Sequence, residues 1–581
     1  MTAPPSLDQY FTQGERIDTF SNAQYTSAPE FNDPIWLDVH GEIPSWLQGV
    51  LYRIGPGKFT LGDKDSRSMT ISHAFDGLAY VHRFEFDGKN QKLRYNSRCT
   101  AKTYEKNLLD NPLGGHSSFG NVHGKGSAWE HFMDFLARSK KSIRTVEDAS
   151  ARSVNVTVTP NYPLPNSFDG PGPVLVAKTD TNMLQKVHHD TLEPERLFDY
   201  SFYNDKLIGQ LSASHHQHDV FTGETFNFVM SLGPQPRLTV FKISKNGNTE
   251  ILAEITNNLD ANNTPFRPAY MHAFWLTQHY VIIPVAPNYI KNHALDLAVT
   301  GNLLAGMEWD PNAPSWLYIV SRDGGHIATV PVDPHFAFHT LHGRDYKDED
   351  GNVVLELNNE AFADGSVLFS TSTLTDVARA DQVQDRDDRR SAAAAKPVHL
   401  SGFQVPSAHD FTKSFGDLRQ YKIVLDKEAP RTASKGNFTT LVKNIEFARI
   451  HPQYQFEKFD HVYFNFILPG EAGKRGDQYG IKKIVLSTQQ ELVWQPDTSD
   501  AYICSEPVFV PRPGATDEDD GVVISLINIY DNRGADQDRC YLLLLNAKTF
   551  TEYGRIPLGQ FTATTFHGSF VDQEFVDGSF N

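Results

Sequence analysis

Four histidine-bearing segments contain the residues of this chain that are best suited to chemistry. Imidazole nitrogens are common ligands of first-row transition metals. Among the 23 histidines, these are His215 in SASHHQHDVFTGETF, His272 in PAYMHAFWLTQHYVIIP, His339 in PHFAFHTLHGRDY and His567 in TTFHGSFV. Each alone is typical of a solvated loop or of a hydrogen-bonded core histidine. The sequence lacks GxSxG, HExxH and Walker A motifs and has no GxGxxG that follows a strand, so histidine remains as the candidate catalytic residue type.

Together the four histidines predict a metal site of neutral ligands. Such a cage leaves the 2+ charge of the metal intact and leaves coordination positions free for O2, whereas zinc would bind but has no redox chemistry. The interval is 57 residues from His215 to His272, 67 residues from His272 to His339 and 228 residues from His339 to His567. These intervals exclude a local motif, and they suit ligands that separate structural units bring to one axis.

Short runs of β-branched and aromatic residues, mostly bounded by Gly, Pro, Asn or Asp, recur along the chain and predict an all-β fold. The clearest runs are Thr225 to Ser231, Tyr280 to Val285, Leu317 to Ser321, Val462 to Leu468, Val522 to Tyr530 and Tyr541 to Asn546. A β-propeller is the economical way to close so many strands. No clean internal repeat gives the number of blades. One helix is predicted over Ala128 to Ser139, where apolar residues recur at helical spacing.

Charge and composition exclude several classes of function. The chain has 581 residues, with 53 Lys and Arg against 71 Asp and Glu, and its formal charge of -18 argues against a nucleic-acid partner. No apolar run approaches the roughly 18 residues of a membrane span, and no targeting sequence is visible at Met1 to Tyr10, so we expect a cytoplasmic protein. Cys99, Cys504 and Cys540 form no CxxC pair, and we expect buried, reduced thiols.

With these segments in view, the chain resembles the carotenoid cleavage oxygenases, also called carotenoid/stilbene dioxygenases, and is most similar to their fungal members. DVHGEIPSWLQGVLYRIGPGKFTLG (Asp38 to Gly62) and SHAFDGLAYVHRFEF (Ser72 to Phe86) are similar to the opening blocks of that family. The resemblance implies a seven-bladed β-propeller with a helical and loop cap over the metal axis. It also implies Fe(II) held by the four histidines, O2 as co-substrate and cleavage of a C=C bond into two carbonyl products.

The resemblance covers residues 31 to 581, which we expect to form a single domain after an N-terminal extension over residues 1 to 30. The segment from 377 to 397 (VARADQVQDRDDRRSAAAAKP) is dense in charge and alanine. We interpret it as a mobile surface insertion within the domain, because strand-like sequence resumes directly after it.

The family also places carboxylates behind the metal-binding imidazoles, where each accepts the distal N–H and fixes the ring. On this resemblance, Glu446 in NIEFARI and Glu506 in SEPVFVPRPG carry that role. The third position is Asp180, where the family usually has Glu, one methylene longer. We therefore expect a longer or water-bridged hydrogen bond there, weaker iron affinity, and Mn(II) as the alternative metal.

For the substrate, the resemblance favours a carotenoid or an apocarotenoid. The alternative is an aryl-alkene such as a stilbene or isoeugenol, because Asn111 to Ser127 is polar and would make at most weak peripheral contact with a membrane. Against that alternative, Cys99 and Thr179 stand where the stilbene-cleaving members have the Tyr and Lys that hold a phenol. A non-redox isomerohydrolase and a propeller that only binds proteins are the remaining alternatives.

Overall fold

The computed structural model describes most of the chain between residues 27 and 572. The described ranges are 27–62, 68–71, 73–111, 118–120, 143–168, 172–370, 414–427, 436–468, 478–498, 500–530 and 539–572. The predicted helix at Ala128 to Ser139, the charged segment at 377–397 and most of the polar segment from Asn111 to Ser127 lie outside these ranges.

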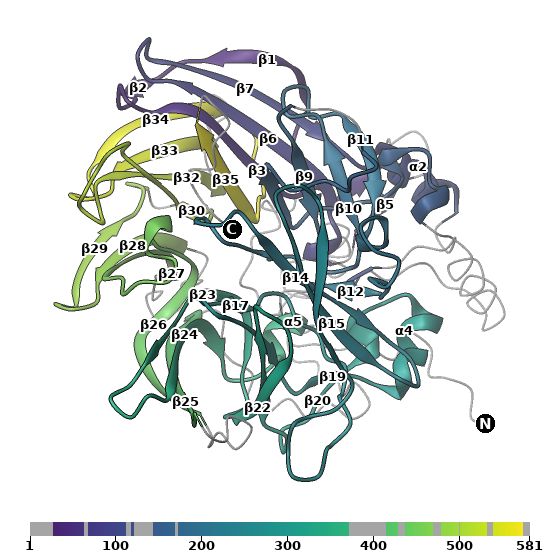
Figure 1. Ribbon diagram of the computed structural model, residues 1–581. Helices are drawn as coiled ribbons and strands as arrows, with labels where there is room; N and C mark the ends of the chain where they lie inside the picture. Colours follow the sequence, from purple (N-terminus) through teal and green to yellow (C-terminus); the bar gives the residue numbers. More distant parts are fainter. Residues whose placement is uncertain are drawn as a thin grey trace, which may run out of the picture.

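The molecule is a ring of antiparallel sheets (Figure 1). One sheet joins the first and last described strands in the order β1-β7-β6-β3-β35. Its strands are β1 (Phe31–Leu37), β3 (Gln48–Lys58), β6 (Leu78–Asp87), β7 (Lys92–Cys99) and β35 (His567–Asp572). The pairing of β3 with β35 runs from Gly49–Asp572 to Ile54–His567, so this sheet closes the ring with the two ends of the described chain.

Three further four- or five-stranded sheets follow in sequence order. The first contains β8 (Thr157–Pro160), β9 (Leu175–Lys178), β10 (Leu184–Val187) and β11 (Pro194–Phe198). The second contains β12 (Leu211–Ser212), β13 (Gln217–His218), β14 (Thr225–Ser231), β15 (Arg237–Ile243) and β16 (Thr249–Ile255). The third contains β17 (Trp275–Leu276), β18 (Tyr280–Val285), β21 (Ser315–Ser321) and β22 (His326–Val332).

The largest sheet has 13 strands, which form three antiparallel groups along the sequence. The first is β23 (Phe336–Lys347), β24 (Val353–Phe362), β25 (Gly416–Leu425) and β26 (Asn437–Arg449). The second is β27 (His461–Ile467), β28 (Gln478–Val485) and β29 (Gln490–Trp494). The third is β30 (Ala501–Cys504), β31 (Val508–Pro511), β32 (Gly521–Tyr530), β33 (Cys540–Asn546) and β34 (Glu552–Gly559), with β2 (His40–Gly41) at its edge. With the four smaller sheets, these groups give seven blades in the described residues, as expected from the resemblance.

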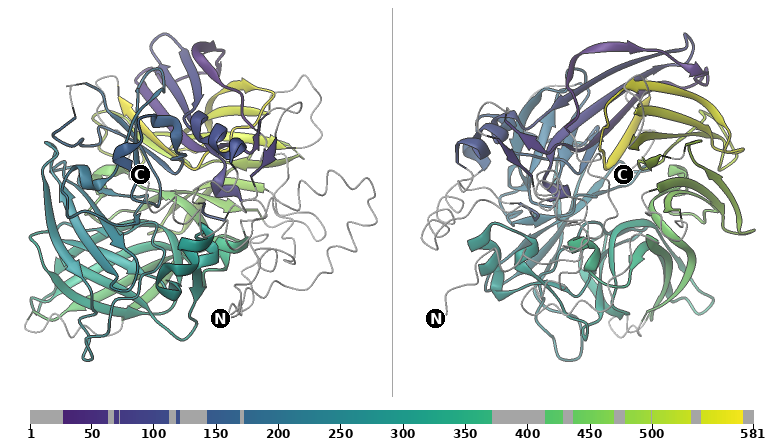
Figure 2. Two further views of the ribbon diagram at one scale, coloured as in Figure 1. Left: turned by 90° about the vertical axis from the view of Figure 1, so that its right-hand side faces the viewer. Right: turned by 180° about the vertical axis from the view of Figure 1, so that it is seen from behind.

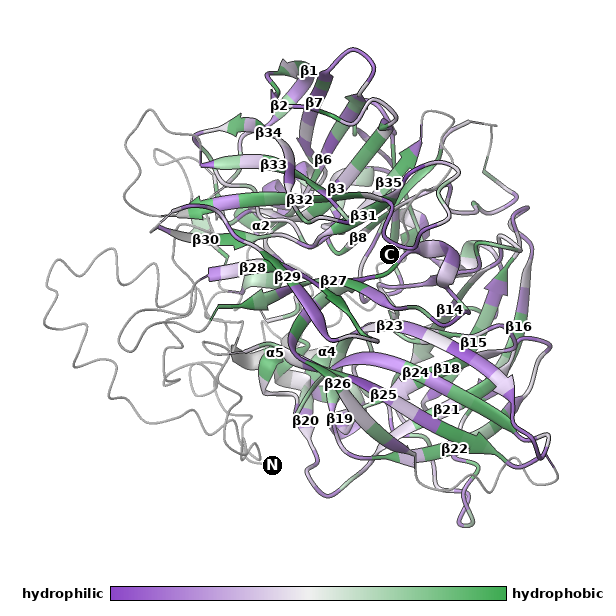
Figure 3. Ribbon diagram, turned by 90° about the vertical axis from the view of Figure 1, so that its left-hand side faces the viewer, coloured by the Kyte–Doolittle hydropathy of each residue, from purple (hydrophilic) through white to green (hydrophobic). Residues whose placement is uncertain are grey.

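Few helices accompany the sheets. The described α-helices are α2 (Lys102–Asp110), α4 (Leu295–Thr300) and α5 (Ser366–Ser370), and the views agree that they lie on one side of the ring (Figures 2 and 3). Two small hairpins, β4 (Thr60–Leu61) with β5 (Met69–Thr70) and β19 (Asn288–Ile290) with β20 (Met307–Trp309), complete the regular structure. None of the helices in the described ranges is long and apolar enough to cross a membrane.

The predicted apolar runs are strands because burial on both faces favours β-branched and aromatic residues. In β14 all residues but the last are buried, and β33 is buried from Cys540 to Leu545. Figure 3 shows hydrophobic residues along these strands and hydrophilic residues in many outer loops. The three cysteines are buried and free, which confirms that they form no disulfide. The division into an extension and one domain from residue 31 stays a prediction.

Candidate metal centre

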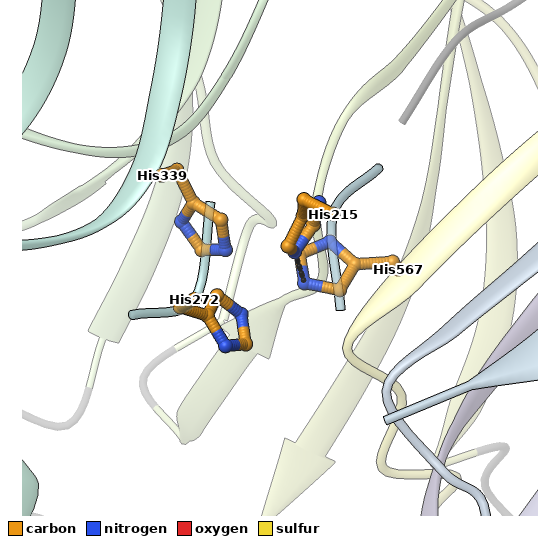
Figure 4. Close-up of side chains that lie close together, drawn as sticks. All are labelled: His215, His272, His339 and His567. Atoms are coloured by element: carbon orange, nitrogen blue, oxygen red, sulfur yellow. Dashed lines mark hydrogen bonds between the residues drawn. The ribbon is translucent and has the colours of Figure 1, made fainter. Parts of the chain in front are cut away.

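Four imidazoles from four different blades lie close together (Figure 4). His215 lies in the connection between β12 and β13, and His272 precedes β17. His339 belongs to β23, and His567 is the first residue of β35. The inner ends of the blades therefore deliver ligands that are far apart in the sequence, as the intervals between them indicated.

The four rings are close enough to share one ion. One nitrogen of each histidine lies within 4.8 Å of the corresponding nitrogens of the others. The ring of His215 is 4.3 Å from that of His567, 4.8 Å from that of His272 and 4.9 Å from that of His339, centroid to centroid. His215 Nε2 lies 3.1 Å from His567 Nε2. The distal Nδ1 atoms of His272, His339 and His567 instead face carboxylates.

His272 is held by Asp180, which lies between β9 and β10. Its Nδ1 is 2.7 Å from Asp180 Oδ1, which is a direct hydrogen bond. The expectation of a longer or water-bridged contact was therefore wrong. Ser214 Oγ donates to Asp180 Oδ1 at 2.5 Å and the Tyr270 hydroxyl donates to Oδ2 at 2.9 Å, and these bonds hold the shorter side chain against the ring.

His339 is held by Glu446 of β26, whose Oε1 lies 2.5 Å from His339 Nδ1. A second buried carboxylate, Glu360 of β24, places Oε2 at 3.7 Å from the same nitrogen. Burial acts to lower the pKa of His339, but Glu360 and Glu446 outweigh it and raise the pKa to about 10. Burial and the neighbouring Glu360 raise the pKa of Glu446 to about 8. The two carboxylates thus favour a proton on the His339 ring, and a metal would compete with that proton for the ring nitrogen.

His567 is held by Glu506, which lies in the connection between β30 and β31. Glu506 Oε1 is 3.0 Å from His567 Nδ1, and Oε2 accepts the backbone N–H of Gly568 at 2.8 Å. Arg449 donates to Oε1 from Nε and Nη2 at 3.0 and 2.7 Å. Burial acts to raise the pKa of Glu506, but Arg449 and His567 outweigh it and hold the pKa well below its usual range.

His215 has no carboxylate within ion-pair distance in the part of the chain that the structure describes. Burial and the three neighbouring imidazoles lower the pKa of His215 well below its usual range, so the ring is neutral. Burial is also the main cause that lowers the pKa of His567 to about 3. The adjacent His216 and His218 point elsewhere, to Lys178 and to the Thr225 hydroxyl, as expected for histidines that are not ligands.

The donor set fits a divalent first-row transition metal. His339 Nε2 is buried and has no hydrogen-bond partner among the described residues, which is the expected state of a nitrogen reserved for a metal. Two neutral imidazoles, His215 and His567, present Nε2 atoms to each other. Carboxylates behind three rings fix which nitrogen faces inward, as at known metal sites.

A cavity of about 1250 Å³ opens beside this cluster. His272, His339 and His567 contribute to its wall together with the three carboxylates Asp180, Glu446 and Glu506. Apolar residues make up much of the remainder, including Phe75, Phe119, Leu303, Phe338, Phe362, Val367, Phe447 and Phe566. His215 instead borders a second cavity of about 110 Å³, which His339 and Glu506 also line. The large cavity therefore suits a long apolar ligand that passes three of the four imidazoles.

Four residues around the centre were not found from the sequence. Ser214 and Tyr270 hold Asp180, Arg449 neutralises Glu506, and Glu360 lies beside Glu446. Ser214 and Tyr270 are each within two residues of a predicted ligand, which is a signal that could have been used. Arg449 follows the predicted Glu446 by three residues in β26, whereas Glu360 reaches the site from β24 only through the fold.

We expect Asp180→Ala to weaken metal binding by about 10- to 100-fold, because His272 then loses the acceptor that orients its ring. Asp180→Asn keeps an acceptor oxygen and should lose less. Metal titration of the purified proteins measures both. Asp199→Ala is the control, since Asp199 lines the same cavity but caps a 3-10 turn at Ser201. Equal affinity in the wild type and in Asp180→Ala would show that this carboxylate does not support the centre.

The fold and this cluster define a class, that of β-propellers with a four-histidine centre on the axis. The model of the family described as retinal pigment epithelial membrane protein, RPE65, matches residues 25–572. The chain belongs to this family.

Relatives and solved structures agree over nearly the whole chain. A carotenoid dioxygenase of Neurospora crassa is 27% identical, over 97% of this chain and 93% of the relative. A torulene dioxygenase of Gibberella fujikuroi is 28% identical, over 94% of this chain and 93% of the relative. The structure of a variant of Synechocystis apocarotenoid oxygenase matches with a TM-score of 0.66 at 21% identity, covering 97% of this chain and all of that one. A cobalt-substituted form of that oxygenase matches with a TM-score of 0.65.

Proposed function

We propose that this protein is a non-haem Fe(II) dioxygenase that cleaves a C=C bond of a carotenoid or apocarotenoid with O2, giving two carbonyl products. The observation that carries this proposal is the four-imidazole cluster beside a large, mostly apolar cavity whose wall contains three of the four rings. The similarity to dioxygenases named for carotenoids and torulene supports the substrate class. None of the relatives named above is an aryl-alkene dioxygenase, and that alternative has no support from them.

His215, His272, His339 and His567 would hold the iron. Bound there, Fe(II) would supply the redox chemistry that activates O2. Iron is our proposal for the native metal and Mn(II) is the alternative, since imidazole nitrogens can bind either ion. The direct bond from Asp180 to His272 removes the structural reason for expecting weak iron affinity.

The protein's own residues would orient the substrate and keep water out. The rings of Phe338 and Phe447 lie near the imidazoles, with Phe338 at 5.5 Å from His272 and Phe447 at 5.1 Å from His339. An extended polyene between such rings has its double bonds held next to the cluster, and the depth to which it enters decides which one is cut. Common ligand sites have volumes of about 300–1000 Å³. The cavity of this protein is larger, at about 1250 Å³, which favours a large substrate.

Product analysis tests this proposal. We expect the Fe(II)-loaded protein to convert torulene, β-carotene or an apocarotenal into shorter aldehydes, only in the presence of O2, with label from isotopic O2 in the products. Liquid chromatography with mass spectrometry identifies them, and metal-free protein is the control. Benzaldehyde-type products from resveratrol or isoeugenol, without cleavage of any carotenoid, would overturn the substrate class. Loading with Mn(II) in parallel decides between the two metals.

The cytoplasmic location and the absence of a nucleic-acid partner remain predictions from the sequence. At most weak peripheral contact with a membrane is predicted, because the segment from Asn111 to Ser127 is polar. Separating a cell lysate into membrane and soluble fractions measures both the location and the contact.

A further inference from the structure

We propose that Glu360 is a positioning residue that fixes the ring of Phe447 beside the metal centre and thereby fixes which double bond of the substrate is cut. This inference rests on the proposed function for its reaction, but its structural part stands independently of it. Glu360 lies in β24 with no exposed surface. Its Oε1 accepts the backbone N–H of Ala448 at 3.0 Å.

The contact falls at an irregular point of β26. The pairing of β26 with β27 shifts register between Glu446 and Arg449, so the residues between them are not paired in that ladder. Within this bulge Phe447 has a φ of +56°, in the left-handed region that non-glycine residues seldom adopt. Such a conformation persists only where neighbouring structure enforces it. The hydrogen bond from Ala448 to Glu360 immediately follows Phe447 and provides that constraint.

The conformation of Phe447 shapes the reaction cavity. Its ring lies 5.1 Å from the ring of His339 and 5.6 Å from that of His567, centroid to centroid. It also borders both the large cavity and the small one. A different backbone conformation at this residue would move the ring relative to the imidazoles and change how a polyene passes them.

Glu360 differs in this role from the three carboxylates that support the imidazoles. Its nearer approach to His339 is 3.7 Å, which is beyond hydrogen-bond distance, whereas Glu446 lies at 2.5 Å. His339 keeps its acceptor when Glu360 is changed, so metal binding should survive. The expected effect is on selectivity.

The test compares Glu360→Leu with Glu360→Gln, which retains an acceptor oxygen for the Ala448 N–H. We expect Glu360→Leu to retain bound iron, to lower kcat/KM by about 10- to 100-fold and to yield aldehydes from more than one double bond of torulene or β-carotene. Glu360→Gln should restore most of the selectivity. Glu356→Leu is the matched control, because Glu356 lies on the same strand and pairs with Arg344, outside the cavity.

A second readout needs no turnover. In metal-free protein, hydrogen exchange of the Ala448 amide should be about tenfold faster in Glu360→Leu than in the wild type and near normal in Glu360→Gln. If the wild type cleaves no carotenoid, the proposed function is wrong. The exchange experiment would still decide whether Glu360 holds this bulge.

A double-mutant cycle with Phe447→Gly separates positioning from general loosening, since glycine tolerates the left-handed conformation and lacks the ring. The effects of Glu360→Leu and Phe447→Gly on the product ratio should be far from additive. Wild-type products and wild-type exchange in Glu360→Leu would overturn the proposal. The proposal would also be overturned if the control variant Glu356→Leu gave the same spread of products as Glu360→Leu.

Discussion

Replacing any one of His215, His272, His339 or His567 with alanine is expected to abolish both bound iron and turnover. Each substitution removes one of the four donor nitrogens that lie within 4.8 Å of one another. Alanine also leaves the carboxylate behind His272, His339 or His567 buried without the ring to which it is bonded. Elemental analysis of the purified variants measures the metal, and circular dichroism checks that the fold is retained.

His342→Leu is the matched control for His339→Ala. His342 lies three residues further along β23 and is buried, but its ring packs against Phe459 at 4.7 Å and not against the cluster. We expect this variant to keep its iron. Turnover retained in two of the four alanine variants would contradict the assignment of the centre.

Arg449→Leu is expected to lower the free energy of unfolding by about 3–5 kcal/mol, because it leaves the buried Glu506 without its principal counter-charge. Glu506 has 3% of its surface exposed and accepts two hydrogen bonds from Arg449. Chemical denaturation monitored by fluorescence measures the change.

The ion pair of Glu506 with Arg449 also makes the stability of the protein depend on pH. The pKa of Glu506 is lowered on folding, so its contribution to stability is present above its ordinary pKa of 4.5 and is lost as the pH falls towards the lowered value. Without Arg449 this lowering is smaller, and acid unfolding should begin at a higher pH. Arg344→Leu is the control: the side chains of Arg344 and its partner Glu356 are 26% and 15% exposed and keep contact with water, so a smaller cost of about 1 kcal/mol is expected. Equal losses in both variants would show that Arg449 has no special role at the centre.

The sequence predicted the strands well because burial on both faces leaves a visible run of β-branched and aromatic residues. Tyr541 to Asn546 and Val522 to Tyr530 are examples, and they make up all but the first residue of β33 and of β32. The number of blades could not be read in this way, since the strands carry no repeated sequence. It came from the resemblance and from the sheet order.

The candidate ligands and the three carboxylates behind them were predicted from the sequence and its resemblance, but the side chains that hold those carboxylates were not. His272 and Asp180 are 92 residues apart, and Tyr270 and Ser214 also donate hydrogen bonds to the Asp180 carboxylate. Side-chain length alone did not predict the direct bond, because that bond depends on where the fold places Asp180 relative to the ring. The contact of Glu360 with Ala448 joins β24 to β26, which lie on either side of β25, and no local sequence pattern encodes such a contact.

The closure of the ring by β3 and β35 also sets the order in which the ligands become available during synthesis. Three of the histidines are made by residue 339, whereas His567 follows 228 residues later, roughly 10 to 45 seconds at about 5–20 residues per second. A growing chain therefore offers at most three of these histidines until His567 of β35 has been made. Binding of a metal by all four histidines requires that β35 has joined β3 in the first blade.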